Sequence, residues 1–178
     1  KIDRFMDGGE QERNMRASTL NTPGIVGLGK AIEMAVADMD KHNAHIASLR
    51  DEFVRQVTER IPEVKLNGAK DFSKRLASNA NFSFKYIEGE SILMRLDLAG
   101  IAVSSGSACS SGSLEPSYVL LSLGVPIELA HGSIRFSFGK NNTMEEVNYT
   151  VDKLEETVRF LRELSPLFKF VQGEQKYV

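Results

Sequence analysis

Apolar side chains recur every three or four residues along the first part of the chain. They include Ile25, Leu28, Ile32, Ala35, Met39, Ile46, Leu49 and Phe53. Because an α-helix has about 3.6 residues per turn, this spacing predicts one continuous helix that is capped by Thr22, has Pro23 in its first turn and ends at Pro62. At about 1.5 Å per residue its length is roughly 55 Å, which exceeds the width of a small domain. We therefore expect the helix to join two domains, with a boundary near Asp38.

Later segments alternate polar with apolar side chains, which is the pattern of half-buried β-strands. The alternation is clear in Asn81–Tyr86 and in Ser133–Phe138, and the short run Ile101–Val103 is a third strand candidate. One face of the second segment carries Ser133, Arg135 and Ser137.

Helical segments lie between and after these strands. We expect helices over Gly89–Leu98 and Ser117–Leu123, and a last regular element that opens with the capping-box pair Thr143 and Glu146. Its apolar stripe comprises Val147, Val151, Leu154, Val158 and Leu161. Strands interleaved with helices, with two long helices beside them, predict an α/β fold of the α+β kind. In this fold the long helices pack on one face of a small sheet.

The composition is that of a globular protein. Hydrophobic residues make up 42% and charged residues 26% of the 178 residues, so we expect most of the chain to fold. The 22 basic and 24 acidic residues are interspersed, which argues against a nucleic-acid or anionic-membrane partner. No apolar run approaches the roughly 18 residues of a membrane span, and the first residues lack the features of a signal peptide. We therefore expect a cytoplasmic protein whose partner is a small molecule or another protein.

Cys109 is the single cysteine of the chain. A single cysteine excludes an internal disulfide and a multi-cysteine metal site, and we expect no bound metal. An isolated cysteine is usually a small buried hydrophobe, but Cys109 lies in Ser104–Ser113, a run of small residues that offers no core of its own. We interpret it as an exposed thiol on a loop over residues 104–115, which could visit first a substrate and then an acceptor. The alternative is a plain linker with an incidental cysteine.

Arg135 is the second candidate for chemistry. It lies on the polar face of a predicted strand whose other face is apolar, so a rigid element holds its guanidinium. A rigidly held arginine suits two-pronged recognition of a carboxylate. The alternative is a surface salt bridge, which is the usual role of an isolated arginine.

Three further motifs carry less weight. Gly24–Ala31 resembles a phosphate-binding loop, but Ala31 stands where a serine or threonine must hold magnesium, so we reject a nucleoside-triphosphate site. His42 and His45 lie one helical turn apart without a third metal ligand, which favours a solvated helix face. His131 precedes the Arg135 strand, and two interpretations stay open for it, a structural cap or a group that supports a neighbouring site.

Several stretches resemble cysteine desulfurases of the branch with a long flexible active-site loop, which serves iron–sulfur assembly. The strongest is Val103–Leu120, which contains Cys109, and it is joined by Glu88–Ser91 and Glu128–Ser137. Asp7–Arg13 at the start of the chain is also similar, and all four stretches follow the family's order.

This resemblance implies the fold of class V aminotransferases, which are homodimers that use pyridoxal 5'-phosphate. Each subunit of that fold has a large cofactor domain and a small C-terminal domain. By resemblance, residues 1–38 are the end of the large domain. Residues 39–178 are then the small domain, which carries the active-site cysteine loop.

The resemblance also implies roles for three residues. Cys109 matches the nucleophile that takes sulfur from L-cysteine, leaving L-alanine and a persulfide whose sulfur passes to an acceptor such as an iron–sulfur scaffold protein. Arg135 matches the arginine that binds the substrate carboxylate, and Thr19 matches a threonine that reaches the cofactor phosphate of the neighbouring subunit. Two positions depart from the family pattern, because Glu10 and Ser18 each replace a glycine.

The lysine that binds the cofactor in this family, within a Ser-x-His-Lys motif, has no match in the sequence. We therefore expect a desulfurase segment that is active only together with an N-terminal portion. One alternative is a stand-alone, non-enzymatic module that carries or docks sulfur through Cys109. Another is a related pyridoxal-phosphate lyase or aminotransferase with a different substrate.

Overall fold

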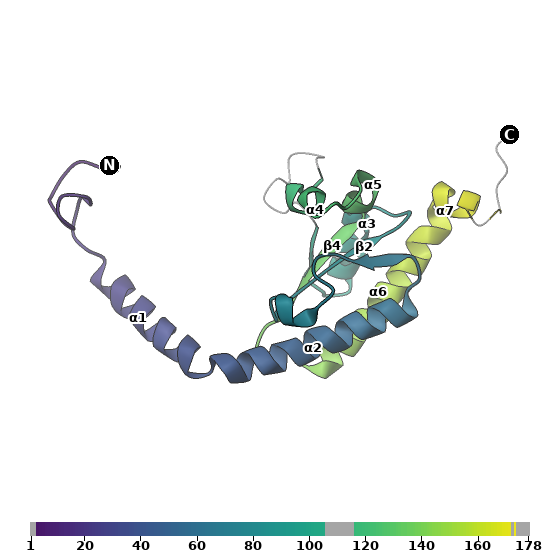
Figure 1. Cartoon of the computed structure of the whole chain (residues 1–178), viewed down its shortest axis with the longest axis horizontal. Coiled ribbons are helices and arrows are strands. Elements are labelled where there is room, and N and C mark those ends of the chain that lie inside the picture. Colours follow the sequence, from purple (N-terminus) through teal and green to yellow (C-terminus); the bar gives the residue numbers. More distant parts are fainter. Residues whose placement is uncertain (1–2, 106–115, 172, 174–178) are drawn as a thin grey trace. The chain divides into compact units, whose positions relative to one another are not determined.

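The computed structural model describes residues 3–105, 116–171 and 173. The chain divides into two compact units, Lys1–Lys41 and His42–Val178. Figure 1 labels the helices and strands along the chain. Among the described residues, no helix has the length and apolarity needed to span a membrane.

The first unit contains helix α1, Thr22–Ala37. Its cap is Asn21, whose side-chain oxygen accepts a hydrogen bond of 3.2 Å from the backbone N–H of Gly24. The prediction that Thr22 caps the helix is therefore wrong by one residue, whereas Pro23 does lie in the first turn. Asparagine caps a helix as well as threonine does, because its short side chain also reaches the free N–H groups of the first turn.

The single helix predicted from Thr22 to Pro62 is also wrong. It is interrupted at Asp38, whose φ of −111° and ψ of 11° are not helical, and α2 then runs over Met39–Arg60. Apolar spacing shows which face of a helix is buried, and one non-helical residue leaves that spacing almost unchanged. Aspartate favours helix ends because its side chain competes for backbone hydrogen bonds.

The second unit is built on a four-stranded antiparallel sheet in the order β1-β2-β4-β3. The strands are β1 Val64–Leu66, β2 Asn79–Phe84, β3 Ser104–Ser105 and β4 Ser133–Ser137. Strands are confirmed in both alternating segments, but the first ends at Phe84 because Lys85 and Tyr86 form a turn in which Tyr86 has a φ of 71°, and the second ends one residue before Phe138. The predicted strand Ile101–Val103 is wrong. The apolar side chains of Ile101 and Val103 pack against the main core without belonging to a strand. The chain joins the sheet only at Ser104.

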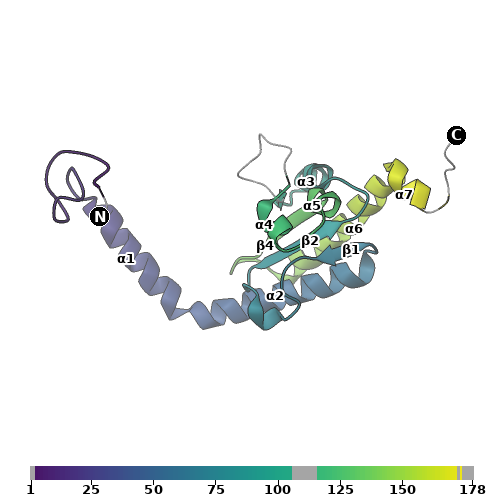
Figure 2. The same cartoon turned by 45° about the horizontal axis from the view of Figure 1, so that its top comes forward.

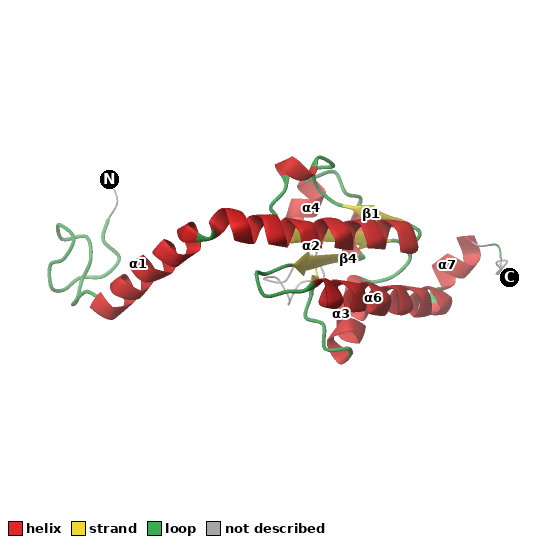
Figure 3. Cartoon of the chain, turned by 90° about the horizontal axis from the view of Figure 1, so that it is seen from below, coloured by secondary structure: helices red, strands yellow, loops and turns green. Residues whose placement is uncertain are grey.

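Two long helices cover one face of this sheet, as predicted. Figure 3 shows α2 and α6, Met144–Leu164, side by side in front of the strands. Phe53 of α2 is fully buried, and its ring centroid lies 4.6 Å from that of Phe136 and 6.2 Å from that of Phe82. Helix α3, Gly89–Leu98, has the predicted bounds and packs against α6.

The opposite face of the sheet carries two short helices, α4 over Tyr118–Ser122 and α5 over Ile127–His131. They lie on the side of the sheet away from α2 (Figures 1 and 2). Leu120, Val125 and Ala130 form a small second core beneath them. The sheet is therefore apolar towards α2 and α6, and it is polar towards α4.

Both hydrogen bonds of the predicted capping box start α6. The Thr143 hydroxyl accepts from the N–H of Glu146 at 3.2 Å, and the Glu146 carboxylate accepts from the N–H of Thr143 at 3.0 Å. The expectation that α6 is the last regular element is wrong, because helix α7 follows over Pro166–Val171. A proline fits the first position of a helix, where no hydrogen bond from its nitrogen is needed. A short 3₁₀ turn, η1, covers Phe72–Lys74.

Candidate substrate pocket on the polar face of the sheet

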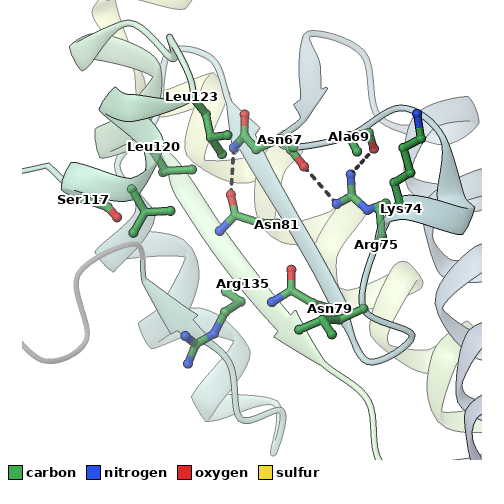
Figure 4. A pocket seen from close by; sticks show the side chains of 13 residues that line it. Asn67, Ala69, Lys74, Arg75, Asn79, Asn81, Ser117, Leu120, Leu123 and Arg135 are labelled. Carbon is green, nitrogen blue, oxygen red and sulfur yellow. Dashed lines mark hydrogen bonds between the residues drawn. The ribbon is translucent and has the colours of Figure 1, made fainter.

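A pocket of about 370 Å³ opens over the polar face of the sheet (Figure 4). Its floor is formed by Asn79, Asn81 and Arg135, and α4 with its preceding residue Ser117 forms one wall. The segment from Asn67 to Leu76 forms the opposite wall. Three of the described lining residues, Lys74, Arg75 and Arg135, are cationic, and none is acidic. The charge of this pocket therefore suits an anionic ligand.

Arg135 holds a central position among the strands. It lies opposite Asn81 of β2 on one side and opposite Ser104 of β3 on the other. Its side chain is exposed, and no carboxylate in the described part of the chain lies within ion-pair distance of it. The guanidinium thus remains available for a ligand as far as the described residues are concerned.

A hydrogen-bonded network lies beside Arg135 on the same face. The side-chain nitrogen of Asn67 donates to the Asn81 side-chain oxygen at 2.7 Å and to the Ser83 hydroxyl at 2.8 Å. The backbone N–H of Asn67 also donates to the backbone oxygen of Asn81 at 2.8 Å. These bonds hold the Asn81 side chain of the pocket floor in a fixed orientation.

Arg75 fixes the wall that contains Asn67. Its guanidinium donates to the backbone oxygens of Ala69 at 2.6 Å and Asn67 at 2.9 Å (Figure 4). Desolvation, and secondarily repulsion from Arg50, lower the pKa of Arg75 from its ordinary value. An arginine nevertheless stays protonated in proteins, so Arg75 adds positive charge to the pocket.

Cys109 lies outside the described residues, but described residues close to its segment on both sides are related to this pocket. On the N-terminal side Ser104 pairs with Arg135, and on the C-terminal side Ser117 lines the pocket. Along the sequence, Cys109 thus lies between Ser104, which pairs with Arg135, and Ser117, which lines the same pocket as Arg135.

Thr19, in the first unit, is exposed and follows a tight turn. The Arg16 guanidinium donates to the backbone oxygens of Ala17, Ser18 and Thr19 at 2.6, 2.7 and 2.7 Å, so Arg16 is engaged in holding the turn. The hydroxyls of Ser18 and Thr19 are both exposed on this turn, and each can donate a hydrogen bond.

The two departures from the expected glycines differ in their consequences. Ser18 has a φ of 70°, in the left-handed region that favours glycine, so the serine keeps the turn at a conformational cost of roughly 1 kcal/mol. Glu10 does not adopt a positive φ, so its position does not require a glycine.

The three motifs of lower weight, which are Gly24–Ala31, the histidine pair and His131, lie within or at the end of helices. Gly24–Ala31 lies inside α1 and forms no loop. The His45 ring nitrogen Nε2 is 3.0 Å from the backbone oxygen of Asn142. His131 is the exposed last residue of α5. Across the described ranges, no group of three or more histidine, cysteine, aspartate or glutamate side chains is arranged to hold a metal.

Sequence reasoning missed Asn67, Asn81 and Arg75 as parts of the pocket. A signal was present for Asn81, because Asn79, Asn81 and Ser83 alternate with apolar residues and so share the polar face of β2. No such signal marks Asn67 and Arg75, which reach the pocket through the pairing of β1 with β2 and through the loop that follows β1.

Residues 6–150 match the family model of the class V aminotransferases, and the chain belongs to this family. Among curated relatives it is 57% identical over 166 residues to the cysteine desulfurase IscS of Dictyoglomus turgidum, covering 93% of this chain and 42% of the relative. It is 50% identical over 167 residues to the cysteine desulfurase IscS of Methanosarcina thermophila, covering 94% and 41%. The chain therefore spans about two fifths of the length of these relatives.

Solved structures agree with this assignment. A NifS-like protein superposes with a TM-score of 0.75 at 33% identity, covering 90% of this chain and 40% of that one. The NifS-like protein of Rickettsia africae gives a TM-score of 0.74 at 26% identity, covering 89% and 41%. The predicted fold class and the predicted resemblance to cysteine desulfurases are confirmed by these relatives.

Proposed function

We propose that this chain is the C-terminal part of a pyridoxal-phosphate-dependent cysteine desulfurase. The observation that carries the proposal is the cationic pocket lined by Arg135, because Ser104, before the Cys109 segment, pairs with Arg135 and Ser117, after it, lines the pocket. High identity to cysteine desulfurases over nearly the whole chain supports the same conclusion. The substrate is L-cysteine and the products are L-alanine and a persulfide on Cys109.

Arg135 binds the carboxylate of L-cysteine. Its backbone is fixed on both sides by the neighbouring strands, and its planar guanidinium can donate two parallel hydrogen bonds to a carboxylate. The neighbouring positive charges of Lys74 and Arg75 add a field that favours an anion. Substrate binding at Arg135 orients the thiol of the substrate for attack.

Cys109 attacks the substrate sulfur as a thiolate. A sulfur–sulfur bond forms and the carbon–sulfur bond of the substrate breaks, which leaves the persulfide on Cys109. Pyridoxal phosphate, when bound, supplies the electron sink for the electrons of the broken bond. Cys109 follows Ser104 by five residues, so the chain allows it to lie at most roughly 17 Å from the strand that pairs with Arg135.

The remaining cofactor contacts come from outside the second unit. Thr19 would donate a hydrogen bond to the cofactor phosphate of the neighbouring subunit in a homodimer, and residues 1–38 are the end of the large cofactor domain. Residues 39–178 form the small domain. The lysine that binds the cofactor belongs to an N-terminal portion of the natural polypeptide.

The Cys109 persulfide then transfers its outer sulfur to an acceptor protein, such as a scaffold for iron–sulfur clusters, in the cytoplasm. An acceptor thiolate attacks that outer sulfur and Cys109 leaves as a thiolate, which restores the enzyme for another turnover.

The full-length polypeptide, loaded with pyridoxal phosphate, tests the proposal. With L-cysteine and a thiol reductant it should produce alanine and sulfide in equal amounts, and Cys109→Ser should abolish sulfide release without lowering the melting temperature. Without reductant, mass spectrometry of the Cys109 peptide should show one added sulfur atom. Sustained sulfide release by Cys109→Ser would show that another group accepts the sulfur.

A further inference from the structure

The side chain of Asn81 is directly across the strand pair from Arg135 on the pocket floor. Directly opposed residues on one face of an antiparallel pair have Cβ atoms roughly 5 Å apart, so both side chains can reach one small ligand. Asn81 is therefore the floor residue that faces Arg135 across the strand pair.

The orientation of the Asn81 amide is fixed by Asn67. The side-chain oxygen of Asn81 accepts from the side-chain nitrogen of Asn67 at 2.7 Å. The oxygen of Asn81 is therefore turned towards Asn67, and its nitrogen is turned away, on the side where Arg135 lies (Figure 4). An amide nitrogen offers two N–H donors, so this orientation presents donors to the pocket.

Asn67 is itself held firmly. It is 3% exposed, and its backbone N–H and its side-chain nitrogen both donate to Asn81. Its backbone oxygen accepts from Arg75 at 2.9 Å. Because two bonds join Asn67 to Asn81 and a third fixes the loop behind it, the Asn81 amide has little freedom to turn.

The side-chain oxygen of Asn67 is a further feature of this network. It is buried and has no hydrogen-bond partner among the described residues. A buried unpaired acceptor destabilises a fold, and such groups persist in native proteins where they have another role.

Resting on the proposed function, we propose that Asn81 is a second donor for the substrate carboxylate beside Arg135, and that Asn67 is its positioning residue. Arg135 supplies charge and two donors, and Asn81 supplies a neutral donor from the adjacent strand. The pair selects a carboxylate over a neutral ester or amide at this end of the substrate, because only an anion accepts from both groups with charge-assisted strength.

Binding of 3-mercaptopropionate to the full-length, cofactor-loaded protein tests this directly. This probe has the thiol and carboxylate of the substrate but no amine, and its methyl ester carries a neutral group of slightly larger size in place of the carboxylate. Asn81→Ala should weaken binding of the acid by about tenfold, the value of one hydrogen bond to a charged group, and leave the ester unchanged in titration calorimetry. Asn141→Ala, an exposed asparagine in the loop after β4, is the matched control and should change neither.

Steady-state kinetics give a second measurement, which separates a role of Asn81 in substrate binding from a purely structural role. Asn81→Ala should raise KM for L-cysteine by about the same factor with kcat nearly unchanged, because the lost bond acts on the bound carboxylate and not on the attack at sulfur. Unchanged affinity for the acid, or equal losses for acid and ester, would overturn the assignment of Asn81.

The positioning role of Asn67 has its own test. Asn67→Ala should also weaken binding of the acid selectively, by less than Asn81→Ala does, and should lower the melting temperature. A folded Asn67→Ala protein with unchanged affinity for the acid would overturn this role, and if the variant does not fold, Asn81→Ala alone decides the proposal. If Asn81→Ala selectively loses acid binding but the wild-type protein makes no alanine from L-cysteine, the desulfurase function is refuted and the Asn81 inference stays intact.

Discussion

Arg135 of β4 and Ser104 of β3 face each other across an antiparallel strand pair. Ser104 is the point from which the chain proceeds towards Cys109, and Arg135 is the proposed carboxylate ligand. One pair of strands thus fixes both the site that anchors the substrate and the starting point of the segment that carries the nucleophile. A change at Arg135 can therefore affect binding while the origin of the Cys109 segment stays in place.

Arg135→Lys should weaken substrate use in the full-length enzyme by about 2 kcal/mol in kcat/KM, because lysine keeps the charge but loses the two-pronged geometry. Steady-state kinetics with L-cysteine measure this. Arg159→Lys, an exposed position on α6, is the matched control and should behave as wild type. Wild-type kinetics for Arg135→Lys would instead support the surface role that is usual for an isolated arginine.

Gly132→Ala should destabilise the second unit by about 2 kcal/mol, because overpacking against fixed backbone has few ways to relax. A Cβ at Gly132 would lie 2.3 Å from the backbone oxygen of Phe84 and 2.7 Å from that of Ile87. Gly132 also leads into β4, so the shift should reach Arg135 and weaken substrate binding. Thermal unfolding and KM report the two effects.

Gly29→Ala is the control for Gly132→Ala. It lies within α1, and an added Cβ there meets nothing within 4 Å among the described residues. Alanine favours a helix over glycine by about 1 kcal/mol, so the melting temperature should not fall. Equal behaviour of the two variants would show that the close approach at Gly132 is relieved elsewhere.

The sequence predicts those features that depend on residues close together in the chain. The bounds of α3 and the capping box of Thr143 and Glu146 follow from local patterns, and both are confirmed. The face of Arg135 follows from simple alternation along β4. The break at Asp38 was missed because a single non-helical residue leaves the apolar spacing of the flanking helices almost intact.

The walls of the pocket could not be predicted in the same way. Asn67 and Asn81 are neighbours because β1 pairs with β2, and strand pairing is a property of the folded chain that neither segment's alternation contains. The position of Arg75 depends on backbone oxygens of a loop, which have no sequence signature at all. The local pattern therefore identified one side of the pocket, and tertiary structure supplied the other.

Acid should destabilise α6 through Glu146. Its pKa lies below the ordinary value of 4.5, because the Asn142 side chain and then the Thr143 backbone N–H donate to the carboxylate. A lowered folded-state pKa adds stability that is present above the unfolded pKa and is lost as the pH falls through the folded value. Glu146→Gln keeps the capping geometry without the charge, so the fall in melting temperature from pH 7 to pH 3 should be smaller than in wild type. Glu145→Gln, in the same first turn, is the control and should retain the wild-type fall.

Borohydride reduction of the full-length, cofactor-loaded protein should label one lysine that lies outside these 178 residues. The lysine that holds pyridoxal phosphate must lose its proton, which requires a buried or strongly cationic setting that lowers its pKa. No lysine among the described residues is buried. Hydrogen bonds to Glu63 and Glu156 raise the pKa of Lys85 and of Lys153, which is the opposite direction. Lys30, in the glycine-rich part of α1, is exposed and forms an ion pair of 2.9 Å with Glu33.

Peptide mapping after reduction locates the label, and an unreduced sample of the same protein is the control. Stoichiometric label on a single lysine of this chain would show that it holds the cofactor itself, and the division of the active site proposed above would be wrong.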